Sequence, residues 1–182
     1  LASTEHGIFC LEKDRKTVRQ YLSGKSSEGV SSRISVNRTG IITAAYGGQI
    51  WMFDELNKNF VQLEHPTDKY MDVRDIILRN NGELLIASYN EGLWKVDENN
   101  RMRCIESEIP NLVSLMEDRE GNLWCGHFYK GITMTPPETS VKDFEYLGHI
   151  NGAVTAILKD SKGKLYLGSQ DGTVSIYEND GA

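Results

Sequence analysis

The chain has 182 residues, enough for one domain or one array of repeats, and its 20 basic and 26 acidic residues leave a formal net charge of −6. This acidic balance argues against nucleic-acid binding, which needs a clustered basic surface to displace counterions. No apolar run approaches the roughly 20 residues that a membrane-spanning helix requires, so we expect no membrane insertion by this segment.

A short sequence repeat recurs along the whole chain: an apolar strand, a tight turn ending in Gly, a second apolar strand, another turn and a third apolar strand. The copies are at 34–53, 76–96, 115–134 and 157–177. Their turn glycines, Gly40, Gly82, Gly121 and Gly163, follow one another at intervals of 42, 39 and 42 residues. A period near forty built from short strands is typical of a β-propeller blade. The pattern predicts an all-β chain made of four-stranded antiparallel sheets, with loops carrying the function.

In chain order, the first partial unit has strands at 1–4, 7–11 and 18–21. Three full units follow, and the clearest predicts strands at 113–117, 122–126, 131–135 and 144–147. Further third strands are expected at 50–53, 93–96 and 174–177, and further fourth strands at 60–63 and 102–105. We therefore divide the single array into a partial unit, three full units and a second partial unit: 1–29, 30–70, 71–110, 111–152 and 153–182.

Three full and two partial units predict about four to five blades that form an incomplete arc of a larger propeller. Leu1 is not an initiator Met, and no signal peptide opens the chain, so we expect a piece of a longer protein. An arc leaves apolar blade surfaces exposed, and such surfaces drive association. We therefore expect a homodimer formed through exposed blade edges.

The three cysteines, Cys10, Cys104 and Cys125, all lie in predicted strands, where Cys serves as a small buried apolar residue. An odd count gives no complete disulfide framework, and no Cys–His spacing matches a zinc site. We expect structural thiols, no metal and no cofactor.

Trp51, Trp94 and Trp124 lie in predicted strands and are expected to fill the space between blades. Asp118 and Asp160 open the turns DREG and DSKG. We expect their carboxylates to accept backbone N–H groups across the turn, because the surrounding ligands are too few for calcium.

The loops between second and third strands collect on one face of a propeller, and three of these four loops carry aromatic residues beside polar ones. Aromatic rings flanked by amides and carboxylates suit a sugar, which has an apolar C–H face and a rim of hydroxyls. The alternative is that these rings fill the interface between blades. The candidate ligand-binding residues are Tyr46, Tyr89, Asn90, His127, Phe128, Tyr129, Gln170 and Asp171.

Catalytic motifs are absent from the sequence: there is no GxSxG elbow and no HExxH. His127 is the one histidine on the expected binding face, and Glu91 and Asp171 are the only acids in these loops. Ordinary exposed charge explains both acids, although distant carboxylates can converge. We expect this segment to be non-catalytic.

The third full unit contains SLMEDREGNLWCGHFYKGI, which resembles the two-component regulator propeller repeat. The matching positions are Asp118, Gly121, Asn122, Leu123, Trp124, Gly126 and Gly131–Ile132. The last unit keeps Asp160, Gly163, Leu165, Gly168 and Gly172, with Tyr166 in the Trp position. The second full unit keeps Gly82, Leu84 and Gly92–Leu93, but has Arg79 for Asp and Leu85 for Trp. The first full unit keeps only Asn37, Gly40 and Gly48.

This resemblance implies the extracytoplasmic, periplasmic sensor of a hybrid two-component histidine kinase. It implies oligosaccharide ligands, control of polysaccharide-utilisation genes, and further propeller blades of the parent protein as partners.

Two other readings stay open. The segment from Gly148 and His149 to Tyr177, with Asp171–Gly172 at a turn, resembles a tryptophan–aspartate repeat, which implies a scaffold for protein–protein interaction without a small-molecule ligand. A propeller enzyme such as a metal-dependent lactonase or a lyase would need converging acids and a metal in the channel.

Overall fold

The computed structural model describes most of the chain. The described residues are 2–4, 6–23, 33–36, 42–46, 48–66, 69–79, 81–97, 99–107, 109, 111–137, 145–148 and 153–177, without the side chains of 2–4 and 145–148.

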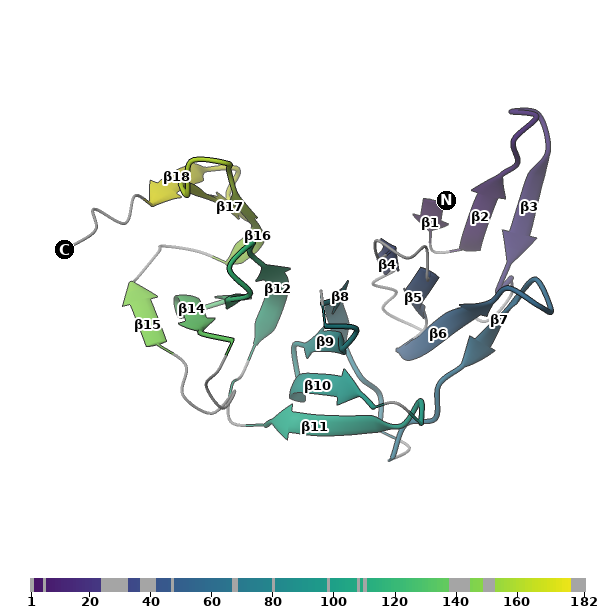
Figure 1. Ribbon diagram of the computed structural model, residues 1–182, viewed down its shortest axis with the longest axis horizontal. Coiled ribbons are helices and arrows are strands. Elements are labelled where there is room, and N and C mark those ends of the chain that lie inside the picture. Colours follow the sequence, from purple (N-terminus) through teal and green to yellow (C-terminus); the bar gives the residue numbers. More distant parts are fainter. Residues whose placement is uncertain are drawn as a thin grey trace. The chain divides into compact units, whose positions relative to one another are not determined.

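Every regular element in the described residues is a strand, and each sheet is an antiparallel meander of strands consecutive in sequence (Figure 1). The first sheet holds β1 (Ala2–Thr4), β2 (Gly7–Leu11) and β3 (Val18–Tyr21). The second holds β4 (Arg33–Val36), β5 (Ile42–Tyr46), β6 (Gln49–Asp54) and β7 (Asn59–Gln62). The third holds β8 (Val73–Leu78), β9 (Leu84–Ser88), β10 (Gly92–Val96) and β11 (Met102–Glu106). The fourth holds β12 (Leu112–Glu117), β13 (Leu123–His127), β14 (Gly131–Thr135) and β15 (Glu145–Gly148). The fifth holds β16 (Val154–Lys159), β17 (Leu165–Ser169) and β18 (Val174–Tyr177).

The all-β prediction is confirmed, and the predicted strands at 7–11, 18–21, 131–135 and 174–177 match the observed bounds. The other predicted strands differ from the observed ones by one residue, at one end or at both. The division into repeat units at the stated boundaries stays a prediction, since several boundaries fall outside the described residues.

The turns between first and second strands are closed by glycine, as the sequence predicts. Gly82, Gly121 and Gly163 have φ of 90°, 85° and 88°, a region that only Gly enters cheaply. Each donates its N–H to the carbonyl three residues earlier, at 3.0 to 3.2 Å. Gly40 lies outside the described residues.

The Asp118 carboxylate accepts hydrogen bonds from several groups of its own turn and from neighbouring strands. Its Oδ1 accepts the backbone N–H groups of Glu120 at 3.1 Å and Asn122 at 2.8 Å. Its Oδ2 accepts the indole N–H of Trp124 at 2.9 Å and the ammonium of Lys159, which reaches across from β16, also at 2.9 Å. The expected turn role of Asp118 is confirmed, and Trp124 has a polar partner in addition to its packing.

The fifth sheet repeats this arrangement with Tyr in the Trp position. Asp160 accepts the N–H groups of Lys162 and Lys164 at 2.8 and 3.0 Å, and the Tyr166 hydroxyl at 3.3 Å. In the third sheet the pair is replaced as a unit by Arg79 and Leu85. In these three sheets, the acidic residue and the hydrogen-bonding aromatic residue are therefore either both present or both replaced.

The fourth and fifth sheets pack face to face. We call the face of a sheet that packs on the next sheet in sequence its forward face, and the opposite face its rear face. The forward face of β12–β15 presents Ser114, Met116, Trp124, Gly126, Ile132 and Met134, which strand register places side by side. Trp124 and Ile132 are buried there against Leu165 and Leu167, from the rear face of β16–β18.

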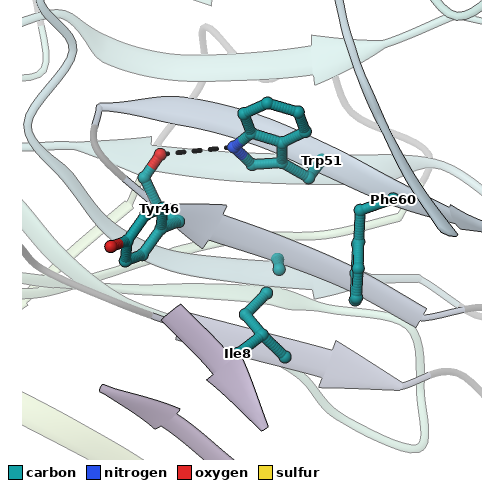
Figure 2. Packing of buried hydrophobic residues seen from close by; sticks show 5 residues of the cluster. Ile8, Tyr46, Trp51 and Phe60 are labelled. Carbon is teal, nitrogen blue, oxygen red and sulfur yellow. Dashed lines mark hydrogen bonds between the residues drawn. The ribbon is translucent and has the colours of Figure 1, made fainter. Parts of the chain in front are cut away.

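The first and second sheets pack in the same way. Ile8, on the forward face of β1–β3, packs with Tyr46, Trp51 and Phe60 from the rear face of β4–β7 (Figure 2). The Trp51 indole donates its N–H to the Tyr46 carbonyl at 3.3 Å. The packing role predicted for Trp51 and Trp124 is confirmed, since both lie in these clusters. Trp94 is buried as well, and its expected place between blades stays a prediction.

The chain forms two compact units. The first comprises residues 1–86 and 95–103, and the second residues 87–94 and 104–182. Of the cysteines, all of which are free thiols, Cys125 is fully buried, and burial raises the pKa of its thiol.

Candidate functional site

Three aromatic side chains meet at the turns β9–β10 and β13–β14, within the second compact unit. The rings of Tyr89 and Phe128 lie edge to face with centroids 5.6 Å apart, and those of Phe128 and Tyr129 with centroids 4.7 Å apart. Such edge-to-face pairs stabilise one another beyond the area they bury. Tyr89 and Phe128 are half-buried, and Tyr129 is 62% exposed. We call Tyr89, Phe128 and Tyr129 the aromatic cluster.

The backbone of Asn111 ties the two turns together. Its N–H donates to the Tyr89 carbonyl at 3.1 Å, and its carbonyl accepts the N–H of Phe128 at 2.9 Å. Asn111 has φ of 60°, a left-handed conformation that Asn tolerates better than most residues. Sequence reasoning missed Asn111; its position directly before β12, after Pro110, is the only signal the sequence offers.

Polar groups adjoin the cluster. The exposed Asn90 follows Tyr89, and its Oδ1 accepts the Ser88 hydroxyl at 2.8 Å. The same hydroxyl oxygen accepts the N–H of Glu91 at 3.2 Å, which fixes the turn on which Asn90 is carried. An amide beside ring surfaces can hydrogen-bond a polar ligand whose apolar part contacts the rings.

Two of the sequence-predicted site residues lie in strands and not in loops. Tyr46 ends β5 and His127 ends β13, and both side chains are buried. His127 Nε2 lies 2.9 Å from the hydroxyl of Thr133. Ser88 and Ser169 occupy the same repeat position, the last residue of the second strand, and are buried as well. This shared position is the signal that could have placed Tyr46 and His127 below the surface, and we leave both out of the proposed ligand surface.

Gln170 and Asp171 lie in the turn β17–β18, where both are exposed. The Gln170 N–H donates to the Ala153 carbonyl at 3.0 Å. Hydrogen bonds from the hydroxyl and N–H of Thr173 lower the pKa of Asp171 below its ordinary value, so this turn carries a negative charge at neutral pH.

Each compact unit also contains a surface cavity. One of about 390 Å³ lies in the first unit, with Gln62, Glu64, His65 and Lys69 among its lining residues. Another of about 250 Å³ lies in the second unit, where Lys159 bonds Asp118 at 2.9 Å and Glu120 at 2.8 Å.

Among the described residues, no group of three or more His, Cys, Asp or Glu side chains is arranged to hold a metal ion. In the same part of the chain, no helix has the length and hydropathy to cross a membrane.

Solved structures share this architecture. Two extracellular domains of hybrid two-component systems from B. thetaiotaomicron match at TM-scores of 0.70 and 0.74, with 19% and 17% identity over 96% and 98% of this chain. Virginiamycin B lyase from Staphylococcus aureus matches at a TM-score of 0.74, with 11% identity over 97% of this chain and 64% of its own. The fold is that of β-propeller blades. This chain spans 24% of the length of each of these extracellular domains.

No family model matches the chain, and no curated protein matches it. The blade fold therefore rests on structural similarity. At these sequence identities the similarity shows a common fold and does not assign an activity to this chain.

Proposed function

We propose that this chain is a ligand-sensing propeller segment of the periplasmic part of a hybrid two-component sensor histidine kinase. Two structurally similar proteins are extracellular domains of such systems, and each matches over nearly all of this chain. The proposed segment is itself non-catalytic, and it acts by passing a binding event to the remainder of its parent protein, which controls polysaccharide-utilisation genes.

The proposed ligand is an oligosaccharide, and the aromatic cluster carries this proposal. A sugar ring offers C–H groups to aromatic faces and hydroxyls that must remain hydrogen-bonded. Tyr129 gives an exposed ring that Phe128 contacts edge to face, Tyr89 in turn contacts Phe128, and Asn90 follows Tyr89 in the same turn. A ligand shifts an equilibrium only by its different affinity for two states. The turns β9–β10 and β13–β14 belong to successive sheets, so a sugar bound across both would respond to a change in their spacing.

Calorimetric titration against a panel of oligosaccharides tests this function, with both the chain and its parent's full extracellular region. Removing the rings in Tyr89→Ala/Phe128→Ala should weaken binding at least tenfold, because the loss of one stacked contact already costs about 1 kcal/mol. The matched control is Tyr70→Ala, since Tyr70 is a partly exposed tyrosine of the first unit, and it should bind as the wild type does.

Circular dichroism on each variant establishes that the fold is retained. Equal affinity in the double variant and the wild type would remove these turns from the proposed site. A lack of binding to any oligosaccharide in the full extracellular region would contradict the ligand class itself.

A further inference from the structure

The cavity of about 390 Å³ in the first compact unit lies where β6 begins and β7 ends. The buried side chains that line it are apolar: Ile50, Leu63 and Met102. The exposed side chains that line it are polar: Gln49, Gln62, Glu64 and Lys69. Ligand pockets usually have volumes of about 300 to 1,000 Å³ and combine apolar surface with a few polar groups that fix orientation. This cavity has both properties.

Backbone contacts hold the part of the lining that carries Glu64. β7 ends at Gln62, but its pairing with β6 continues, because the Leu63 N–H donates to the Ile50 carbonyl at 2.9 Å. Glu64 then forms an isolated parallel bridge with Arg101, directly before Met102 of β11. The segment from Leu63 to Glu64 is therefore held on both sides. A carboxylate carried on such a backbone binds a ligand with less loss of conformational freedom.

A close contact at Gly48 holds the part of the lining that carries Lys69. Gly48 has φ of 72°, and a Cβ there would lie 2.6 Å from the ring of Tyr70 and 3.3 Å from the Met71 carbonyl oxygen. The Tyr70 ring can pack on this backbone only because the residue is glycine. Lys69 directly precedes Tyr70, so the contact fixes the chain next to the Lys69 ammonium.

The charges in the cavity are of opposite sign. Within the part of the chain that the structure describes, the side chains of Glu64 and Lys69 form no ion pair or hydrogen bond. A ligand with one charge would match only one of them, and an uncharged sugar would match neither. An ammonium and a carboxylate on the same small molecule would match both with charge-assisted hydrogen bonds.

We propose that this cavity binds a free α-amino acid with an apolar side chain. Its ammonium pairs with Glu64 and its carboxylate with Lys69, while its side chain contacts Ile50 and Met102. The amides of Gln49 and Gln62 supply further donors and acceptors. The aromatic cluster belongs to the other compact unit, so this inference does not depend on the sensor function or on an oligosaccharide ligand.

Calorimetric titration of the whole chain with leucine tests the proposal. Two analogues keep the apolar side chain and one charge each: isocaproate lacks the ammonium, and isoamylamine lacks the carboxylate. Leucine should bind saturably, with one molecule per chain. Each analogue should bind about tenfold more weakly or worse, because it loses one charge-assisted hydrogen bond. Glucose should not bind at this site.

Substitutions in the cavity assign the binding to these residues. Glu64→Gln and Lys69→Met remove one charge each with little change of shape, and each should raise the dissociation constant for leucine by about tenfold. The matched controls are Glu55→Gln and Lys58→Met, which remove the same charges from an exposed ion pair in the turn between β6 and β7. Both controls should bind leucine as the wild type does. All four positions are exposed, so thermal unfolding should show unchanged stability.

A wild type that shows no saturable binding up to the solubility limit of leucine would overturn the proposal. Equal affinity for leucine and for either analogue would overturn it too, because one charge would then suffice. Wild-type affinity in Glu64→Gln or in Lys69→Met would exclude this cavity. Equal losses in the Glu55 and Lys58 controls would show an effect of net charge and no specific site.

Discussion

At the scale of single residues, the Asp118 side chain links its own turn to β13 and to β16 of the next sheet. Its carboxylate is fully buried and accepts five hydrogen bonds, two from backbone N–H groups and three from side chains. Burial alone would raise the pKa of Asp118, but the bonds from Lys159, Asn122 and Trp124 outweigh it and lower the pKa from 3.8 to about 2. A hydrogen bond joins Asp118 to Trp124 in the fourth sheet, and another joins Asp160 to Tyr166 at the same repeat positions in the fifth.

Asp118→Asn should lower the free energy of unfolding by about 3 kcal/mol, because an amide leaves one set of buried donors facing another donor. The matched variant is Asp160→Asn, at the same repeat position but less buried, where the loss should be clearly smaller. Urea denaturation at neutral pH measures both. Equal losses in the two variants would contradict the importance assigned to burial and to Lys159.

The pH dependence of the free energy of unfolding tests whether the pKa of Asp118 is lowered in the folded state. A carboxyl with a depressed folded-state pKa contributes stability that is complete above its unfolded pKa of 3.8 and is lost as pH falls towards about 2. The stability difference between wild type and Asp118→Asn should therefore be constant near neutrality and shrink below about pH 4. A difference that widened on acidification would contradict the lowered pKa.

At the scale of strands and turns, the sequence predicts the sheets well because each turn glycine has a local physical cause. Gly121 and Gly163 each follow an apolar run and have φ near +85°. Because Gly adopts this conformation cheaply, the two turns can be predicted without knowledge of the tertiary structure. The alternation of β17 and β18 likewise indicates strands, although it does not say which face a neighbour covers.

The candidate site was predicted less completely, and turn length explains why. The β5–β6 turn is short, so Tyr46 pairs with Gln49 and remains in the strand, with its side chain in the core. The β13–β14 turn is longer, so Phe128 and Tyr129 leave the sheet while His127 stays paired with Gly131. Aromatic content alone does not separate these cases; the register across the turn does.

Packing between sheets makes a prediction at this scale. Gly126→Ala should destabilise the fold by about 1 to 3 kcal/mol, because the added methyl collides with Ser114 and with the backbone of Val154. Gly168→Ala is the control, since an alanine there meets only an ordinary contact with Ala156. Thermal unfolding of dilute samples measures both. A neutral Gly126→Ala would mean that the fourth and fifth sheets pack less closely than described.

At the scale of the whole molecule, stability in a repeat array is a sum of sheet terms and nearest-neighbour interfaces, so local protection should follow the number of covered faces. All five residues of β13 are buried, and they lie between β12 and β14. In β18, by contrast, exposed and half-buried residues alternate. In the first unit, β5 has four buried residues and one half-buried, whereas β3 has three exposed residues.

Amide hydrogen exchange should accordingly be slower in β13 than in β18, and slower in β5 than in β3, when the protein is dilute. Equal exchange rates in β13 and β18, or in β5 and β3, would contradict the assignment of local stability to the number of covered sheet faces.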